Sequence, residues 1–174
     1  MLFWVKYLKG LLQSFHDDTS PNEIAGAFVL GAWIGLIPKT NLTTLIIWII
    51  TWVFRVNLGI ALATIAVFSL LGHFTDPLVE KWGYFALTGI PALQGFWTAL
   101  YNAPLLPYLS FNNTLVMGNL IFGLVLAVPL FLGMRAFVGI YRTRYREKIS
   151  KWKVMQALQA TKFYHTYERW IKRP

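Results

Sequence analysis

The chain has 174 residues, of which 56% are hydrophobic and only 13% are charged. Soluble domains usually carry about a quarter charged residues, so this composition excludes an ordinary soluble domain and predicts a small all-α integral membrane protein. The absence of cysteine from the sequence excludes disulfides, thiolate metal sites and a thiol nucleophile. The net charge of +9 comes mainly from Lys and Arg near the C-terminus, which is typical of a tail on the cytoplasmic face of a membrane.

Residues 1–19 are predicted to form an amphipathic helix at the membrane interface. Apolar residues recur there at helical spacing, with Lys6 and Lys9 on the other side. These lysines interrupt the apolar run and no small-residue cleavage site follows, which disfavours a signal peptide. We expect a membrane domain at residues 20–138 and a basic helical tail at residues 139–174 to follow.

Two short apolar helices, 24–37 and 42–54, are predicted to form a hairpin with a polar tip between them. Ser20 and Pro21 suit the start of the first helix, and we interpret Glu23 as part of its cap rather than as an acid catalyst. Each helix would be roughly 20 Å long, whereas the hydrocarbon core of a bilayer is about 30 Å thick. The hairpin is therefore expected either to tilt strongly or to form a re-entrant loop.

The first hairpin helix carries a flat face of small residues. Ala27, Gly31 and Gly35 repeat every four positions, which lets another helix backbone approach closely within a membrane. We expect the neighbour on this face to be the second helix of the same hairpin, and homodimerisation is the alternative.

Several motifs around this hairpin together resemble the signature of a known family. They are Ser20-Pro21, Ala25, the Gly-x-x-x-Gly-x-x-Pro run that includes Gly31, Gly35 and Pro38, and Arg55-Val56-Asn57. The family is an uncharacterised group of small bacterial inner-membrane proteins that carry a domain of unknown function, and the resemblance covers approximately residues 15–85. It implies a bacterial cytoplasmic membrane and a helical hairpin core, and it implies no particular activity.

A third helix is predicted at residues 58–72, after the polar residues Arg55 and Asn57. Arg55 is expected to extend to the lipid headgroups, because an arginine at a helix end reaches the interface easily. The alternative is that Arg55 is buried and pairs with an anion. Asn57 is expected to cap or end a helix rather than bind a ligand.

A polar cluster around His73 and Asp76 follows the third helix. We expect Thr75 or Asp76 to cap a further helix with Pro77 in its first turn, and a proton relay or metal site at His73 and Asp76 is the alternative. The three histidines come from distant segments without ligand spacing, so no metal site is predicted.

Residues 82–134 contain no charged side chain. The first part is interrupted by glycines and prolines and is rich in aromatic residues, which is typical of a short interfacial or re-entrant segment. The second part, 114–138, is long enough to span a bilayer, with Asn112 or Asn113 as its cap and a kink at Pro129.

The C-terminal tail combines basic and aromatic residues. Because it follows a spanning helix directly, we favour anionic lipid headgroups or a protein partner over RNA or DNA as its ligand. The basic candidates are Arg142, Arg144, Arg146, Lys148, Lys151 and Lys153. We predict a multi-pass protein of the bacterial inner membrane with both termini in the cytoplasm. This topology places these residues, and also Lys6, Lys9 and Arg55, on the cytoplasmic side, where membrane proteins carry their excess of positive charge.

Two functions follow from these features. The first is a non-catalytic accessory or anchoring subunit of a larger envelope complex concerned with lipid or envelope-component transport. The second is an autonomous transporter or scramblase of lipid or a small solute, with a polar site near the hairpin tip. No catalytic motif supports a lipid-modifying enzyme, and no cofactor is predicted. The candidate transport or binding residues are Lys39, Thr40, Asn41, Thr43, Thr44, Arg55, Asn57, His73 and Asp76.

Overall fold

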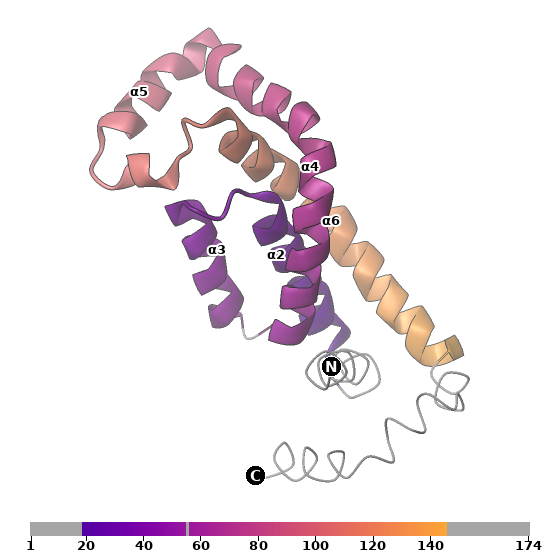
Figure 1. Cartoon of the computed structure of the whole chain (residues 1–174). Helices are drawn as coiled ribbons and strands as arrows, with labels where there is room; N and C mark the ends of the chain where they lie inside the picture. Colours follow the sequence, from indigo (N-terminus) through magenta and orange to yellow (C-terminus); the bar gives the residue numbers. More distant parts are fainter. Residues whose placement is uncertain (1–18, 55, 146–174) are drawn as a thin grey trace.

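The computed structural model describes residues 19–54 and 56–145, which are all helices and connecting turns, with no strand (Figure 1). The long elements are α2 (Pro21–Leu36), α3 (Leu42–Val53), α4 (Leu58–Thr88), α5 (Gln94–Asn102) and α6 (Thr114–Ile140). The short turns are η1 (Pro91–Leu93), η2 (Leu106–Leu109) and a π-helical turn, η3 (Tyr141–Tyr145). The predicted helical class is thus confirmed, whereas the helices predicted within residues 1–18 and 146–174 lie outside the described residues.

Polar residues fix the starts of α2, α3, α4 and α6. Ser20 accepts a hydrogen bond from the Asn22 amide at the start of α2, where Pro21 occupies the first turn. Asn41 and Asn57 cap α3 and α4 in the same way. Asn113 caps α6 and accepts from the amides of Leu115 and Val116. These side chains satisfy amides that have no partner inside the helix, and they set the boundaries expected at Ser20, Asn57 and Asn113.

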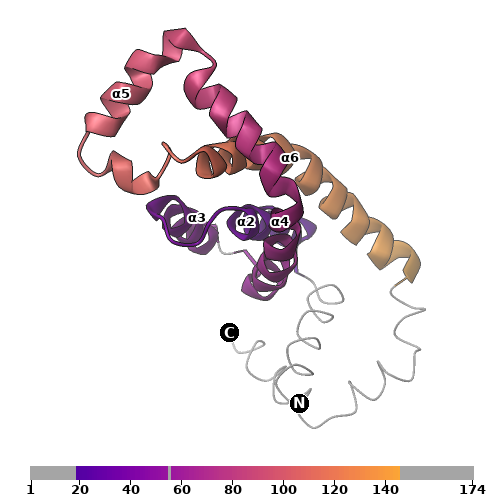
Figure 2. The ribbon, with the colours of Figure 1, turned by 45° about the horizontal axis from the view of Figure 1, so that its top comes forward.

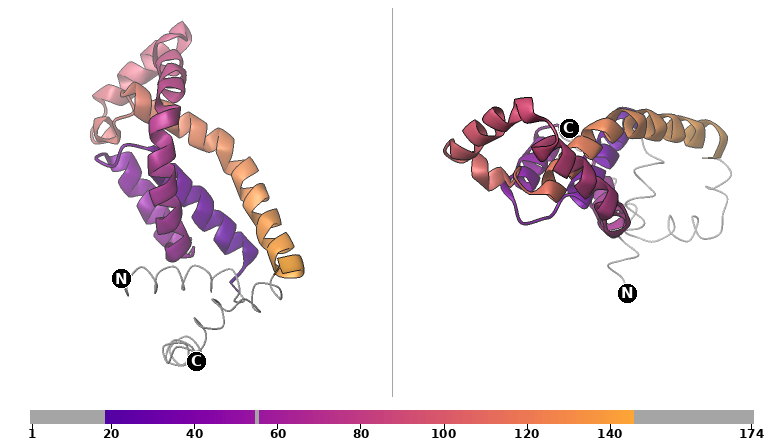
Figure 3. Two further views of the ribbon diagram at one scale, coloured as in Figure 1. Left: turned by 45° about the vertical axis from the view of Figure 1, so that its right-hand side comes forward. Right: turned by 90° about the horizontal axis from the view of Figure 1, so that it is seen from above.

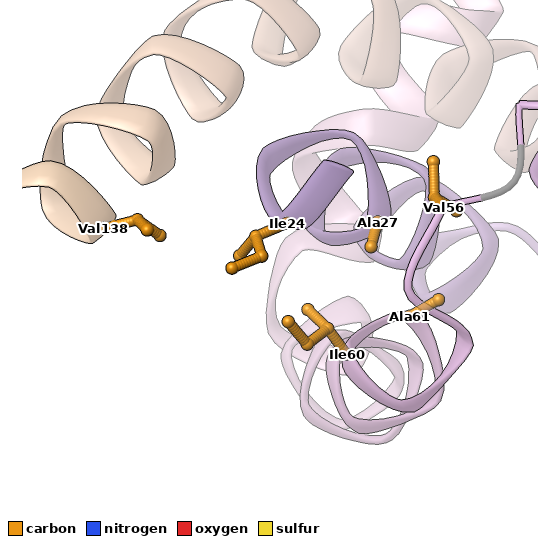
Figure 4. Packing of buried hydrophobic residues seen from close by; sticks show 6 residues of the cluster. All are labelled: Ile24, Ala27, Val56, Ile60, Ala61 and Val138. Atoms are coloured by element: carbon orange, nitrogen blue, oxygen red, sulfur yellow. The ribbon is translucent and has the colours of Figure 1, made fainter. Parts of the chain in front are cut away.

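The core is formed by α2, α4 and α6. Helices α4 and α6 lie close together at one end of the molecule and diverge toward the other, and α2 fills the space between them (Figures 2 and 3). At the wide end, Val138 of α6 points toward Ile24 of α2, next to Ile60 and Ala61 of α4 (Figure 4).

The small-residue face of α2 packs against α4. A Cβ added at Gly31 would lie 2.6 Å from the Ala61 carbonyl oxygen, and one at Gly35 would lie 2.7 Å from the Phe68 Cβ. The expectation that α3 covers this face is therefore wrong. The physical reason is that α4 presents a long helical surface parallel to α2, whereas α3 is short and makes only a few contacts with α2.

The third helix does not end at Gly72. Helix α4 continues to Thr88 with Pro77 inside it, so the predicted cap at Thr75 or Asp76 is wrong. A proline inside a helix removes one backbone hydrogen bond, but packing against a neighbouring helix can stabilise the helix in spite of that loss. Here the packing comes from α6. A Cβ at Gly83 would overlap the Thr114 carbonyl, and one at Gly118 would overlap the Val79 carbonyl.

The segment between α4 and α6 forms an arch at the narrow end of the molecule (Figure 2). Trp97 of α5 donates a hydrogen bond to the Ala86 carbonyl, which ties the arch to the end of α4. Helices α4 and α6 are both long and apolar enough to cross a membrane, with candidate spans of Leu58–Thr88 and Thr114–Arg144. This property is compatible with membrane association. Between these two candidate spans, residues 84–101 are divided among the end of α4, η1 and α5 and do not form one continuous helix.

Candidate functional site

The hairpin tip is the first candidate site. Asn41 accepts hydrogen bonds from the amide and the hydroxyl of Thr44, and its own amide group donates to the Pro38 carbonyl. The Thr44 hydroxyl also lies 2.9 Å from that carbonyl. Thr43 donates to the Leu109 carbonyl at 2.7 Å, which holds η2 over the start of α3. Thr43 and Thr44 are buried and Thr40 is exposed. Most of the polar side chains of the tip are therefore paired with the protein itself.

Lys39 closes the end of α2. Its Nζ donates to the carbonyl oxygens of Gly35 at 2.7 Å and Ile37 at 3.2 Å, which are otherwise unpaired at a helix C-terminus. The Asp76 carboxylate lies near the same end of α2, because a Cβ added at Gly72 would be 3.9 Å from both the Asp76 Oδ1 and the Leu36 backbone. The structure thus brings Asp76, which is distant in the sequence, to the end of α2 that Lys39 closes.

The other predicted tip residues are not gathered into this group. His73 is exposed and lies 3.3 Å from the Ser69 carbonyl of its own helix. Asn57 serves as the α4 cap at the opposite end of α2 from the tip. Arg55 lies outside the described residues. Within the described part of the chain, no cluster of three or more His, Cys, Asp or Glu residues could hold a metal ion.

The basic tail is described only at its beginning. Arg142 donates to the Thr19 carbonyl at 2.6 Å, so its guanidinium contacts the chain just before α2. Arg144 is exposed. The remaining candidates, Arg146, Lys148, Lys151 and Lys153, lie outside the described residues.

A groove along α2 was not predicted from the sequence. Two open cavities of about 400 and 310 Å³ lie side by side along α2 with Gly26, Leu30 and Phe131 in both linings, and together they are called the groove below. Its described lining comes from α2, α6, the end of α3 and Val56, and it includes no residue of α4. No sequence pattern indicated it, because its walls come from three segments that only the tertiary fold brings together.

A buried amide in α6 was also missed. Asn119 is fully buried, and its side-chain nitrogen donates to the Leu115 carbonyl while its side-chain oxygen has no partner among the described residues. Its backbone carbonyl accepts a hydrogen bond from Trp33 of α2 at 3.1 Å. The available signal was a single amide within the otherwise apolar run of residues 115–134.

Comparison with known proteins identifies the family. The family described as "Uncharacterized protein conserved in bacteria (DUF2062)" matches residues 5–147, and the chain belongs to it. An "Uncharacterized protein" of Treponema pallidum (strain Nichols) is 29% identical over 145 residues, which cover 83% of this chain and 89% of that protein. No solved structure matches the chain.

Proposed function

We propose that this protein is a multi-pass accessory or anchoring subunit of a larger complex in the bacterial inner membrane, concerned with lipid or envelope-component transport. The composition and the two long apolar helices support a membrane location. Helix α4, with 31 residues, would be about 46 Å long and can cross the bilayer with length to spare.

A re-entrant hairpin fits the lengths of α2 and α3. The end of α2 lies beside Gly72 of α4, because a Cβ at Gly72 would be 3.9 Å from the Leu36 backbone. This level is about 21 Å along α4 from Leu58, whereas the hydrocarbon core is about 30 Å thick. We therefore infer that the tip stops inside the membrane, with both ends of the hairpin on the cytoplasmic side. The basic tail supports this orientation.

The pairing of the tip's polar groups is the observation that carries the subunit proposal. A polar loop within a bilayer must satisfy its hydrogen bonds from protein or from enclosed water. Here Lys39, Asn41, Thr43 and Thr44 are used by the chain itself. A tip that uses its polar side chains for its own fold suits a structural element of an assembly better than a polar conduction site.

The position of Asp76 near the end of α2 that Lys39 closes favours the alternative, an autonomous transporter of lipid or a small solute. Charged groups of opposite sign beside a re-entrant tip are the kind of feature on which ion or headgroup coupling depends. Under this alternative, purified protein would move its cargo across liposome membranes and Lys39→Ala would abolish the movement. The exposed Lys81 provides the matched control as Lys81→Ala.

Affinity purification from native membranes in mild detergent tests the subunit proposal. We expect a stoichiometric protein partner, identified by mass spectrometry, to accompany the full chain and to be lost when residues 146–174 are deleted. The deletion starts after Tyr145 so that the contact between Arg142 and Thr19 is kept. A full chain that purifies without any partner would contradict the proposal, and so would a truncated chain that retains every partner.

A further inference from the structure

The groove along α2 has a polar end and an apolar body. Asn22 and Glu23, in the first turn of α2, line one end of it. Beyond them the lining is apolar, with Ile50 of α3 and the adjoining Phe54 on one wall and Phe131 of α6 on the other. The wall of α6 continues through Ala127, Val128 and Leu132. Such a groove offers hydrogen-bonding groups at its mouth and only van der Waals contacts along its length.

This division of polarity matches one lipid molecule. An acyl chain fills an apolar groove that opens sideways into a bilayer, and its headgroup stays at the interface. Glu23 is exposed and is the charged residue among the described lining of the groove. A carboxylate attracts a cationic headgroup and repels an anionic one. A headgroup that contacts Glu23 is therefore expected to carry a protonated amine.

We propose that the groove binds one phospholipid with an amine headgroup, whose acyl chain lies along α2 between α3 and α6 and whose ammonium group contacts Glu23. The inference rests on the membrane location in the proposed function. Gly26 is central to it, because this residue lines both cavities.

Lipid retention in nanodiscs tests the assignment. The full chain is placed in nanodiscs made of equal amounts of phosphatidylethanolamine and phosphatidylglycerol with identical acyl chains, and the lipids that remain bound after extraction are counted by native mass spectrometry. We expect one retained phosphatidylethanolamine per chain, enriched about threefold over phosphatidylglycerol, as suits an exposed ion pair. Glu23→Gln should keep a bound lipid and lose the enrichment.

Filling the groove should remove the lipid. We expect Gly26→Leu to lose the retained lipid, and Ala127→Leu on the opposite wall to do the same. The second variant is needed because a Cβ at Gly26 would lie 3.3 Å from Val56 and could disturb packing. Gly133→Leu is the matched control, because a Cβ added at Gly133 meets nothing within 4 Å and Gly133 lies outside the groove lining.

Several results would overturn the assignment. They are equal retention of both lipids by the unaltered chain, undiminished enrichment in Glu23→Gln, and full lipid retention in both groove-filling variants. No partner protein is present in the nanodiscs, so these results leave the subunit proposal standing. A chain that stays soluble without detergent or lipid would instead overturn the membrane location, and with it the proposed function.

Discussion

At the residue scale, the contact between Trp33 and α6 links two features of the core. The indole of Trp33 lies over Gly123, where an added Cβ would overlap the ring, and its N–H donates to the Asn119 carbonyl one turn earlier. An indole that is largely buried needs a hydrogen-bond partner, and the missing side chain at position 123 gives it access to one. A single glycine thus allows both the ring packing and the hydrogen bond.

Substitution of Gly123 tests this contact. We expect Gly123→Ala to destabilise the protein by about 1–3 kcal/mol, because the new methyl group must displace a large ring in a packed core. The measurement is the thermal unfolding midpoint in detergent. Gly133→Ala on the same helix is the control. That position is open, so the substitution should be neutral or slightly stabilising through helix propensity. Equal effects of the two substitutions would contradict the packing.

At the scale of elements, α4 is the helix that organises the fold. Its first half packs on the small residues of α2, and its second half packs on the start of α6 through Gly83 and Gly118. Pro77 lies between these two contact regions. Tertiary packing on both sides therefore holds the helix through a residue that would end an isolated one.

Replacing Pro77 distinguishes a continuous helix from two separate ones. Inside α4, Pro77→Ala restores a backbone donor for the carbonyl four residues earlier, so we expect stabilisation of about 1 kcal/mol. At the start of a separate helix, the proline would be favourable and its loss would destabilise the protein. A lower unfolding midpoint for Pro77→Ala would thus contradict the continuous α4.

At the scale of the whole molecule, the arch between α4 and α6 contacts the tip of the hairpin. The arch of α5 and η2 joins the far ends of α4 and α6, and the hairpin tip contacts it through the hydrogen bond from Thr43 to the Leu109 carbonyl (Figure 1). Under the orientation proposed above, we expect the arch to face the side of the membrane opposite the ends of the hairpin, with the tip held against it.

Cysteine labelling tests that arrangement, because the natural sequence contains no cysteine. Thr40, Asn102 and Arg144 are all exposed in the protein. With a membrane-impermeant thiol reagent on intact cells, we expect Asn102→Cys to react from outside and Arg144→Cys to react only after lysis. Thr40→Cys should react slowly under both conditions, because the proposed orientation places it within the bilayer. Rapid labelling of Thr40→Cys from outside would mean that the hairpin crosses the whole membrane.

By itself, the sequence determined the helical class, the helix starts at Ser20 and Asn57, and the approximate extent of the last long helix, with its cap narrowed to Asn112 or Asn113. These features depend on local chemistry. Capping involves residues two or three positions apart, and apolar periodicity is visible within one helix. The same reasoning identified Gly31 and Gly35 as a packing face, because small residues at a spacing of four always share a face.

Only the tertiary structure decided the partner of that face, the continuity of α4 through Pro77 and the position of Asp76 near the end of α2. It also created the groove, whose walls are α2, the end of α3 and a part of α6 about a hundred residues later in the chain. Each of these outcomes depends on contacts between residues that are distant in the sequence. The residues of one helix indicate that a face is available for packing. Which helix packs against that face depends on the competition among all the helices of the fold.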